Sequence, residues 1–170
     1  AGVESMSRVP MGASMQNGPG FPFPPSLTGK FNLVPQGISA EMIAEKWGIS
    51  REENDAFSVE SHLRAARATE EGRYEREIIP VPVTTDDGTT EFSRDEGIRP
   101  DSSVEKLAQL KPAFKKDGTV TAANSSSISD GAAAMVLMRA STAEKLGIKP
   151  LARIVAHSQH SQEPNWFTTA

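Results

Sequence analysis

Apolar residues recur at helical spacing between Ser39 and Gly72. The first part of this segment has an apolar face and stops at Gly48. A second helix is expected from Ser50, because Ser50 and Glu53 have the spacing of a capping box. Its apolar stripe follows at three- and four-residue intervals: Ala56, Val59, Leu63 and Ala66. The pattern therefore predicts two consecutive helices, the second closed by Gly72.

Strand signals follow this helix pair. Residues 78–84 are typical of an edge strand because they contain two prolines, and Asp87-Gly88 predicts a hairpin turn before a return strand at 89–92. Residues 132–138 form a continuous apolar run, typical of a strand buried on both faces. Further elements are expected as strands at 1–9, 120–121 and 151–156, and as helices opened by Ser102/Glu105 and by Ser141/Glu144. This order predicts an α/β fold that is cut at both ends.

The segment between residues 10 and 25 contains five prolines and three glycines. Proline fixes φ and removes a backbone donor, so this segment predicts a loop without regular structure. The loop is either a surface linker or a segment docked by Phe21 and Phe23, because exposed aromatic rings are costly.

Composition narrows the class of protein. The 170 residues are 37% hydrophobic and 24% charged, with a net charge of −4, which disfavours a nucleic-acid partner. The absence of cysteine excludes disulfides, thiolate metal sites and a cysteine nucleophile within this chain. We see neither an apolar run long enough to span a membrane nor a signal peptide, so a soluble, cytoplasmic protein is expected.

Few residues suggest chemistry by themselves. His62 favours a structural role, and His157, His160 and Glu163 lack the helical pattern that a metal site would need, so no metal is expected. Small and hydroxyl side chains at 121–134 either let a slender ligand approach the backbone closely or form a polar turn that leads into a tightly packed strand. Four lysines with no acid between them follow Arg99, and they form either a phosphate-binding surface or a solvated face: Lys106, Lys111, Lys115 and Lys116.

Eight short motifs resemble the thiolase family, in the order in which that family has them. They lie at 2–7, 36–41, 51–68, 77–81, 95–100, 107–114, 118–126 and 130–134. The resemblance implies a layered α/β fold of two similar halves with a loop domain inserted in the first. It assigns 1–9 to the end of the N-terminal half, 10–112 to the loop domain, and 113–170 to the return to the first half and the start of the C-terminal half.

The resemblance implies acyl transfer between a 3-ketoacyl-CoA and coenzyme A, catalysed in that family by a cysteine and a Gly-His-Pro histidine. Neither motif lies in this sequence, so no catalytic residue is expected here and the segment alone should be inactive. Coenzyme A or acyl-CoA is expected as substrate, without a permanently bound cofactor. A homodimer or homotetramer is implied, in the cytoplasm or, in a eukaryote, in the peroxisome or mitochondrion.

The part of the family site that this chain retains is the coenzyme A site. The resemblance places Arg99 beside the adenine, with Leu107 and Leu110 in the same groove. It places three residues along the pantetheine arm, with Asn124 holding the turn: Phe114, Ala122 and Ser126.

One departure from the family bears on the substrate. Pro35 and Gln36 stand where short-chain biosynthetic thiolases usually carry His-Met, which indicates longer or bulkier acyl groups and a degradative enzyme, for fatty-acid or sterol-side-chain substrates. The alternative is a non-catalytic acyl-CoA-binding or scaffold protein of thiolase ancestry, consistent with the absence of cysteine. If sheet neighbours lie outside the chain, the apolar run at 132–138 is expected to be exposed.

Overall fold

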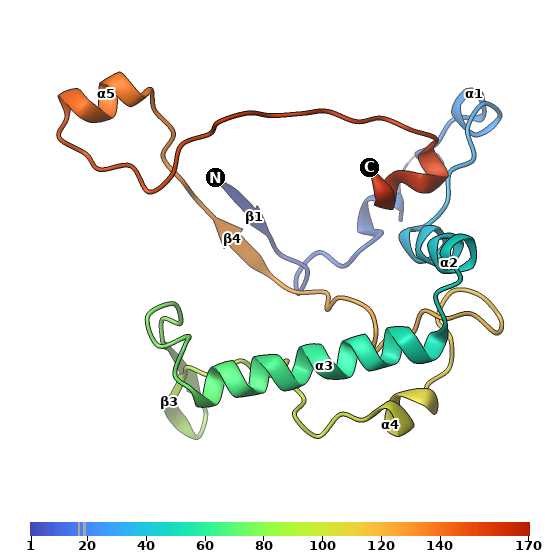
Figure 1. Ribbon diagram of the computed structural model, residues 1–170, viewed down its shortest axis with the longest axis horizontal. Helices are drawn as coiled ribbons and strands as arrows, with labels where there is room; N and C mark the ends of the chain where they lie inside the picture. The colour runs from blue at the N-terminus through green and yellow to red at the C-terminus, as the bar shows by residue number, and fades with distance from the viewer. Residues whose placement is uncertain (17, 19) are drawn as a thin grey trace. The chain divides into compact units, whose positions relative to one another are not determined.

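The computed structural model describes residues 1–170 except 17 and 19, and of Ser14 it describes no side chain. The chain divides into two compact units. One is formed by Ala1–Leu33 with Ile128–Ala170, and the other is Val34–Ser127 (Figure 1).

Two helices begin the unit Val34–Ser127. The first, α2 (Gln36–Trp47), ends at Gly48 in the left-handed region, as predicted. The second, α3 (Arg51–Glu70), starts from the predicted capping box, in which Ser50 Oγ accepts from Glu53 N at 3.1 Å and Ser50 N donates to Glu53 Oε2 at 2.7 Å. The bond from the Ser50 amide lowers the pKa of Glu53. Local sequence alone therefore defines where α3 begins.

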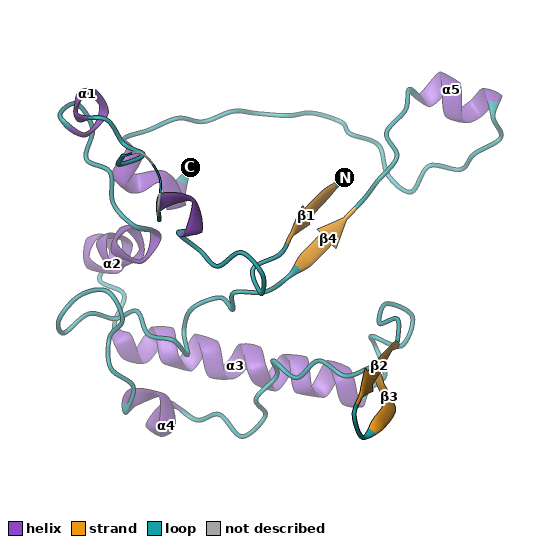
Figure 2. Ribbon diagram, turned by 180° about the vertical axis from the view of Figure 1, so that it is seen from behind, coloured by secondary structure: helices purple, strands orange, loops and turns teal. Residues whose placement is uncertain are grey.

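A hairpin and a short helix follow α3. Strands β2 (Val81–Thr85) and β3 (Gly88–Phe92) form the predicted antiparallel hairpin. Its turn lies one residue earlier than predicted, at Asp86-Asp87, because Gly88 already pairs with Thr85. Helix α4 (Val104–Ala108) lies alongside α3 (Figures 1 and 2). Its cap is Ser103, whose Oγ accepts from Lys106 N at 3.3 Å. The predicted cap at Ser102 was therefore wrong by one residue, because the next hydroxyl is the one aligned with the free amide of the first turn.

The buried face of α3 differs from the predicted stripe. Ala56 is exposed and Leu63 is 44% exposed, whereas Asp55 is 1% exposed. The prediction was wrong because the segments that pack on the start of α3 bind its polar Asp55 face. Burial here follows hydrogen-bond partners far away in the sequence, which periodicity does not contain.

The other unit contains a two-stranded antiparallel sheet. Strand β1 (Gly2–Glu4) pairs with β4 (Gly131–Ala133), with Val3 opposite Ala132. Next to the sheet, the Asp130 carboxylate accepts from Ser7 N at 2.8 Å and from Ser7 Oγ at 2.5 Å, and these bonds lower its pKa. The remaining elements of this unit are short: η1 (Ala13–Met15), α1 (Pro25–Thr28), α5 (Ala140–Lys145) and η2 (Pro164–Thr169).

The loop predicted at 10–25 contains the single turn η1 and the first residue of α1, while residues 17 and 19 lie outside the described part. Phe21 and Phe23 are 73% and 40% exposed and contact each other edge to face, with ring centroids 5.6 Å apart. The two rings therefore do not dock the loop, and the surface-linker alternative fits the structure better.

Three further sequence predictions were wrong. Residues 120–121 and 151–156 form no strand, and α5 follows Arg139 as its cap, with Ser141 inside the helix. The apolar run at 132–138 is a strand only as far as Ala133. Beyond it the side chains are exposed, reaching 84% at Val136. The expectation of a run buried on both faces fails because no described segment covers it, and the expected exposure without sheet neighbours is confirmed.

Apolar burial is sparse throughout the described residues. Three apolar side chains of these residues are buried: Ala44, Leu107 and Ala143. Four polar side chains are also buried: Ser39, Glu41, Asp55 and Thr121. Three of these four polar side chains belong to the network described below. None of the described helices is long and apolar enough to cross a membrane.

Candidate functional site

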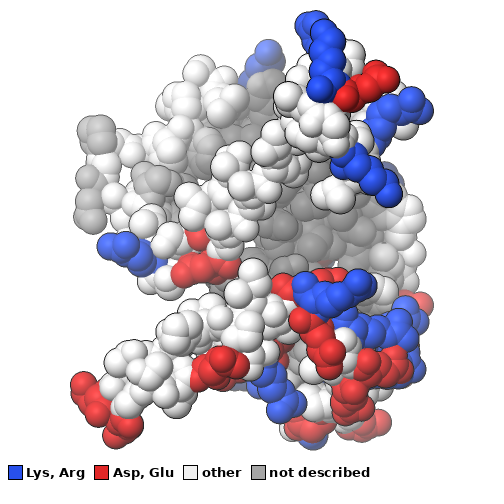
Figure 3. Space-filling view, turned by 90° about the vertical axis from the view of Figure 1, so that its left-hand side faces the viewer, with Lys and Arg blue, Asp and Glu red and all other residues white. Residues whose placement is uncertain are grey.

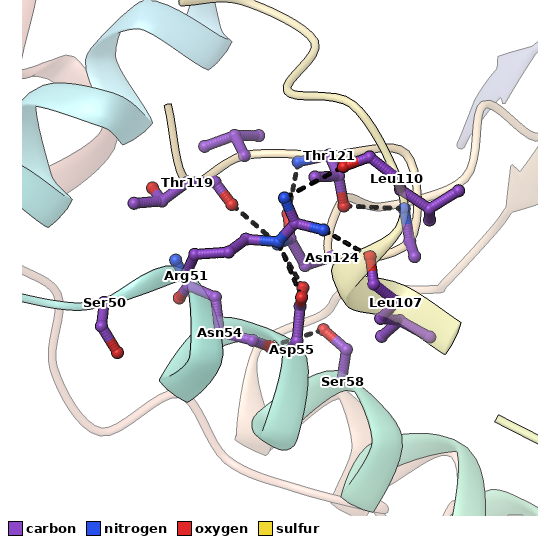
Figure 4. A network of polar contacts seen from close by, with 12 residues as sticks. Ser50, Arg51, Asn54, Asp55, Ser58, Leu107, Leu110, Thr119, Thr121 and Asn124 are labelled. Carbon is purple, nitrogen blue, oxygen red and sulfur yellow. Dashed lines mark hydrogen bonds and ion pairs between the residues drawn. The ribbon is translucent and has the colours of Figure 1, made fainter. Parts of the chain in front are cut away.

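An ion pair at the start of α3 joins two segments that the sequence singles out. Arg51 Nε lies 2.7 Å from Asp55 Oδ2, one helical turn away. The guanidinium of Arg51 also donates to the carbonyl of Leu110 at 3.1 Å and to that of Leu107 (Figure 4). One side chain therefore fixes the backbone at both predicted groove residues, Leu107 and Leu110.

The other oxygen of Asp55 holds the turn that follows Thr119. Asn124 Nδ2 donates to Asp55 Oδ1 at 3.0 Å and to the Thr119 carbonyl at 2.9 Å, while Asn124 Oδ1 accepts from Thr121 N at 2.7 Å (Figure 4). One more hydrogen bond within the turn joins Ser125 Oγ, the donor, to the Thr121 carbonyl at 2.6 Å. The prediction that Asn124 holds the turn is confirmed.

A second buried carboxylate, on α2, holds the same turn from its other end. Glu41 is 4% exposed and accepts three hydrogen bonds, from Thr119 N at 2.8 Å, Thr119 Oγ1 at 3.0 Å and Val120 N at 2.8 Å. A Cβ at Gly118 would lie 2.3 Å from Glu41 Oε1, so only glycine lets this carboxylate approach. Residues 119–124 are therefore fixed between a carboxylate of α2 and one of α3.

The ring of Phe114 packs on the first turn of α2. A Cβ at Gly37 would lie 2.2 Å from Phe114 Cδ2, so the close contact requires glycine at this position. Gly37 follows directly on Gln36, the first residue of α2, and Pro35, its cap. The structure thus brings the predicted arm residue Phe114 against Gly37, the residue that directly follows the predicted acyl-pocket pair Pro35 and Gln36.

The remaining predicted contacts carry exposed side chains. Ala122 and Ser126 lie in and just after the fixed turn, and both are exposed. Arg99 is also exposed, and its backbone N donates to His62 Nδ1 at 3.2 Å. His62 has the structural role that the sequence favoured, because it ties the Arg99 segment to α3.

The lysines that follow Arg99 do not form an uninterrupted basic surface. Lys106 pairs with Asp101 at 2.8 Å, which lowers the pKa of Asp101, and Lys115 pairs with Glu45 at 3.1 Å. On the face drawn in Figure 3, acidic and basic side chains of the described residues lie beside one another. The charges therefore resemble a solvated surface more than a polyanion site.

The carboxylates of this network are suited to positioning rather than to proton transfer. Glu41 and Asp55 are buried, and the hydrogen bonds described above occupy both oxygens of each. No group of histidine, aspartate and glutamate side chains in the described part of the chain has the arrangement of a metal site. Sequence reasoning assigned no individual role to Glu41 or Arg51. The signals that could have found them were the four-residue spacing of Arg51 and Asp55 and the motifs at 36–41 and 51–68, which contain Glu41 and this pair.

Comparison with known proteins shows the family of this chain. The family model for the thiolase N-terminal domain matches residues 1–141. This chain belongs to the thiolase family. A probable acetyl-CoA acyltransferase of Staphylococcus aureus (strain COL) is 43% identical over 177 aligned positions, which cover 96% of this chain and 44% of that protein. An acetyl-CoA acetyltransferase of Chromobacterium violaceum is 50% identical over 139 positions, covering 81% of this chain and 36% of that protein.

Solved thiolase structures show the same fold. The acetyl-CoA acetyltransferase of Bacillus anthracis is 42% identical with a TM-score of 0.69, over 78% of this chain and 34% of that one. Human mitochondrial 3-ketoacyl-CoA thiolase is 34% identical with a TM-score of 0.65, over 91% and 41%. The chain thus has part of the thiolase-like α/β fold, and it spans less than half the length of these relatives.

Proposed function

We propose that this chain is a segment of a longer thiolase, which transfers an acyl group between a 3-ketoacyl-CoA and coenzyme A. The observation that carries the proposal is the match of the thiolase N-terminal domain to residues 1–141. The names of the relatives, acetyl-CoA acyltransferase and acetyl-CoA acetyltransferase, support the same chemistry.

The proposed reaction has two covalent steps. A cysteine thiolate outside this chain attacks the keto carbonyl, the carbon–carbon bond breaks, and acetyl-CoA leaves as its enolate and takes a proton. The thiol of coenzyme A, deprotonated as it attacks, then accepts the acyl group from the enzyme thioester and releases the cysteine. Because this chain contains no cysteine, we assign it no step of bond making or breaking.

We assign to this segment the binding of coenzyme A. Arg99 would contact the adenine, Leu107 and Leu110 would line the groove, and the pantetheine arm would lie along three residues: Phe114, Ala122 and Ser126. Residues 107–110 and 119–125 are both hydrogen-bonded to the Arg51–Asp55 ion pair on α3. This supports the assignment, because it holds two of the proposed contact segments in fixed positions relative to each other.

We further propose a degradative enzyme, acting on longer or bulkier acyl chains. The departure from the family at Pro35 and Gln36 carries this proposal, and the packing of the Phe114 ring on the next residue, Gly37, supports it. The remaining parts of the account are proposals from the family resemblance. They are the loop domain at 10–112 between 1–9 and 113–170, a homodimer or homotetramer, and a cytoplasmic location or, in a eukaryote, a peroxisomal or mitochondrial one.

The second candidate is a protein that binds acyl-CoA without turnover. The absence of cysteine from the 170 residues favours it, and the sequence that flanks this segment discriminates the two. A cysteine before Ala1 and a Gly-His-Pro histidine after Ala170 favour the enzyme.

Substitutions in the full-length protein test the binding assignment. We expect Arg99→Ala and Ser126→Ala to raise the KM for coenzyme A about tenfold each with kcat nearly unchanged, because contacts to a remote part of a substrate bind ground and transition states alike. Arg94→Ala and Ser127→Ala are the matched controls, exposed residues of the same segments. Equal KM values in all four variants would contradict the assignment.

A further inference from the structure

We propose that Glu41 is a positioning residue for coenzyme A, which acts by holding the backbone of Thr119 and Val120 in the conformation that presents Ala122 and Ser126. The inference rests on the proposed coenzyme A site. It adds a residue on α2, distant in sequence from every proposed contact of the pantetheine arm.

The first argument is the charge of Glu41. Its side chain is buried, and no lysine, arginine or histidine among the described residues lies within ion-pair distance of it. Burial of a carboxylate is costly unless hydrogen bonds compensate it, and an apolar residue of similar volume fills the same space at lower cost. A carboxylate retained at such a position is explained by the geometry that it imposes on its donors.

The second argument is what the carboxylate holds. Its three donors are two successive backbone amides and one hydroxyl, all at the start of the turn. The next amide, Thr121 N, donates to Asn124 Oδ1, so each backbone N–H from 119 to 121 is hydrogen-bonded. The Thr121 carbonyl accepts from Ser125 Oγ. Ala122 lies in this fixed segment and Ser126 directly follows it, and both side chains are exposed. Glu41 therefore acts on the site through the backbone, without touching the ligand.

The third argument is that glutamine does not replace this glutamate. Oε2 accepts from Thr119 N and Oγ1, while Oε1 accepts from Val120 N. A glutamine has a single acceptor oxygen, so its amide nitrogen would face one of the two backbone N–H groups and leave it unpaired. Glu41→Gln therefore keeps the side-chain volume and removes one of the two hydrogen bonds from the Thr119 and Val120 N–H groups.

The test uses the full-length protein with Glu41→Gln, with Thr119→Val as a milder variant that removes only the hydroxyl donor. The matched control is Glu45→Gln, the same change one turn later on α2, at an exposed side chain paired with Lys115. Three quantities are measured for each: the KM for coenzyme A and kcat in thiolysis, equilibrium binding of coenzyme A, and amide hydrogen exchange of the peptides covering 113–127.

We expect Glu41→Gln to raise the KM and the dissociation constant for coenzyme A by three- to thirtyfold, with kcat within twofold. Thr119→Val should raise both by two- to fivefold, and Glu45→Gln should leave both within twofold. Exchange should rise at 113–127 in Glu41→Gln and not at 51–70. A KM and dissociation constant within twofold of the unsubstituted protein in both test variants would overturn the inference, as would a loss of kcat alone. A failure of the proposed function is distinct, because then the unsubstituted protein itself neither binds nor turns over coenzyme A.

Discussion

Replacement of Asp55 by asparagine tests whether the α3 network stabilises the protein. Asp55 is 1% exposed, and its two oxygens accept from Arg51 and from Asn124. Asparagine keeps the volume but has one acceptor oxygen, so its amide nitrogen must face one of these two donors. The substitution also leaves Arg51 without its carboxylate.

The expected cost follows from the burial of the two partners. Removal of one partner from a buried ion pair costs about 3–5 kcal/mol. The Arg51 side chain is 22% exposed and keeps the carbonyls of Leu107 and Leu110, so water and these acceptors compensate part of its charge. We therefore expect Asp55→Asn to lower the free energy of unfolding by about 2–3 kcal/mol.

The assay is denaturant unfolding of the full-length protein. The control is Glu60→Gln, because Glu60 forms the same kind of pair with Arg64 on the same helix at 2.6 Å, with both side chains exposed. Exposed pairs of this kind contribute little to stability, so the control should unfold close to the unsubstituted protein. Equal losses in the two variants, or a loss below about 0.5 kcal/mol for Asp55→Asn, would refute the reasoning.

Three further predictions follow. Gly37→Ala should displace the Phe114 ring and lower the free energy of unfolding by about 1–3 kcal/mol, as overpacking does; an unchanged unfolding midpoint would contradict the contact. The pairing of Ser7 with Asp130 lowers the pKa of Asp130, so the stability that it contributes is complete above the ordinary aspartate range and is lost as pH falls through the lowered value. Asp130→Asn should flatten that acid limb of a pH–stability profile, and an identical profile would refute the assignment. The 170 residues expressed alone should aggregate or melt broadly, because apolar side chains such as Val136 are exposed; a sharp melt of a monomer would contradict this.

The elements that the sequence predicted well are those whose determinants are local. The capping box at Ser50 and the β2–β3 hairpin each need only a few neighbouring residues, and both are present, with the hairpin turn one residue before the predicted Asp87-Gly88. The ends of α2 and α3 follow from glycines for the same reason. These signals predicted α2, α3 and the β2–β3 hairpin within Val34–Ser127.

The predictions that failed depended on distant partners. Periodicity placed the buried face of α3 on Ala56 and Leu63, whereas Asn124, 69 residues away, selects the Asp55 face. The run at 132–138 has the composition of a buried strand, but burial requires covering segments. Nothing in the local pattern of Glu41 distinguishes it from a solvated helical glutamate, because its three donors lie 78 and 79 residues later.

The measurement that tests the central claim most directly is thiolysis by the full-length protein, with coenzyme A and with short and long 3-ketoacyl-CoA substrates compared. The account predicts acetyl-CoA and a shortened acyl-CoA as products, with faster turnover of the longer or bulkier chains. Turnover of acetoacetyl-CoA but not of longer chains would contradict the degradative assignment. Binding of acyl-CoA with no turnover of either substrate would contradict the enzyme itself and favour the binding protein.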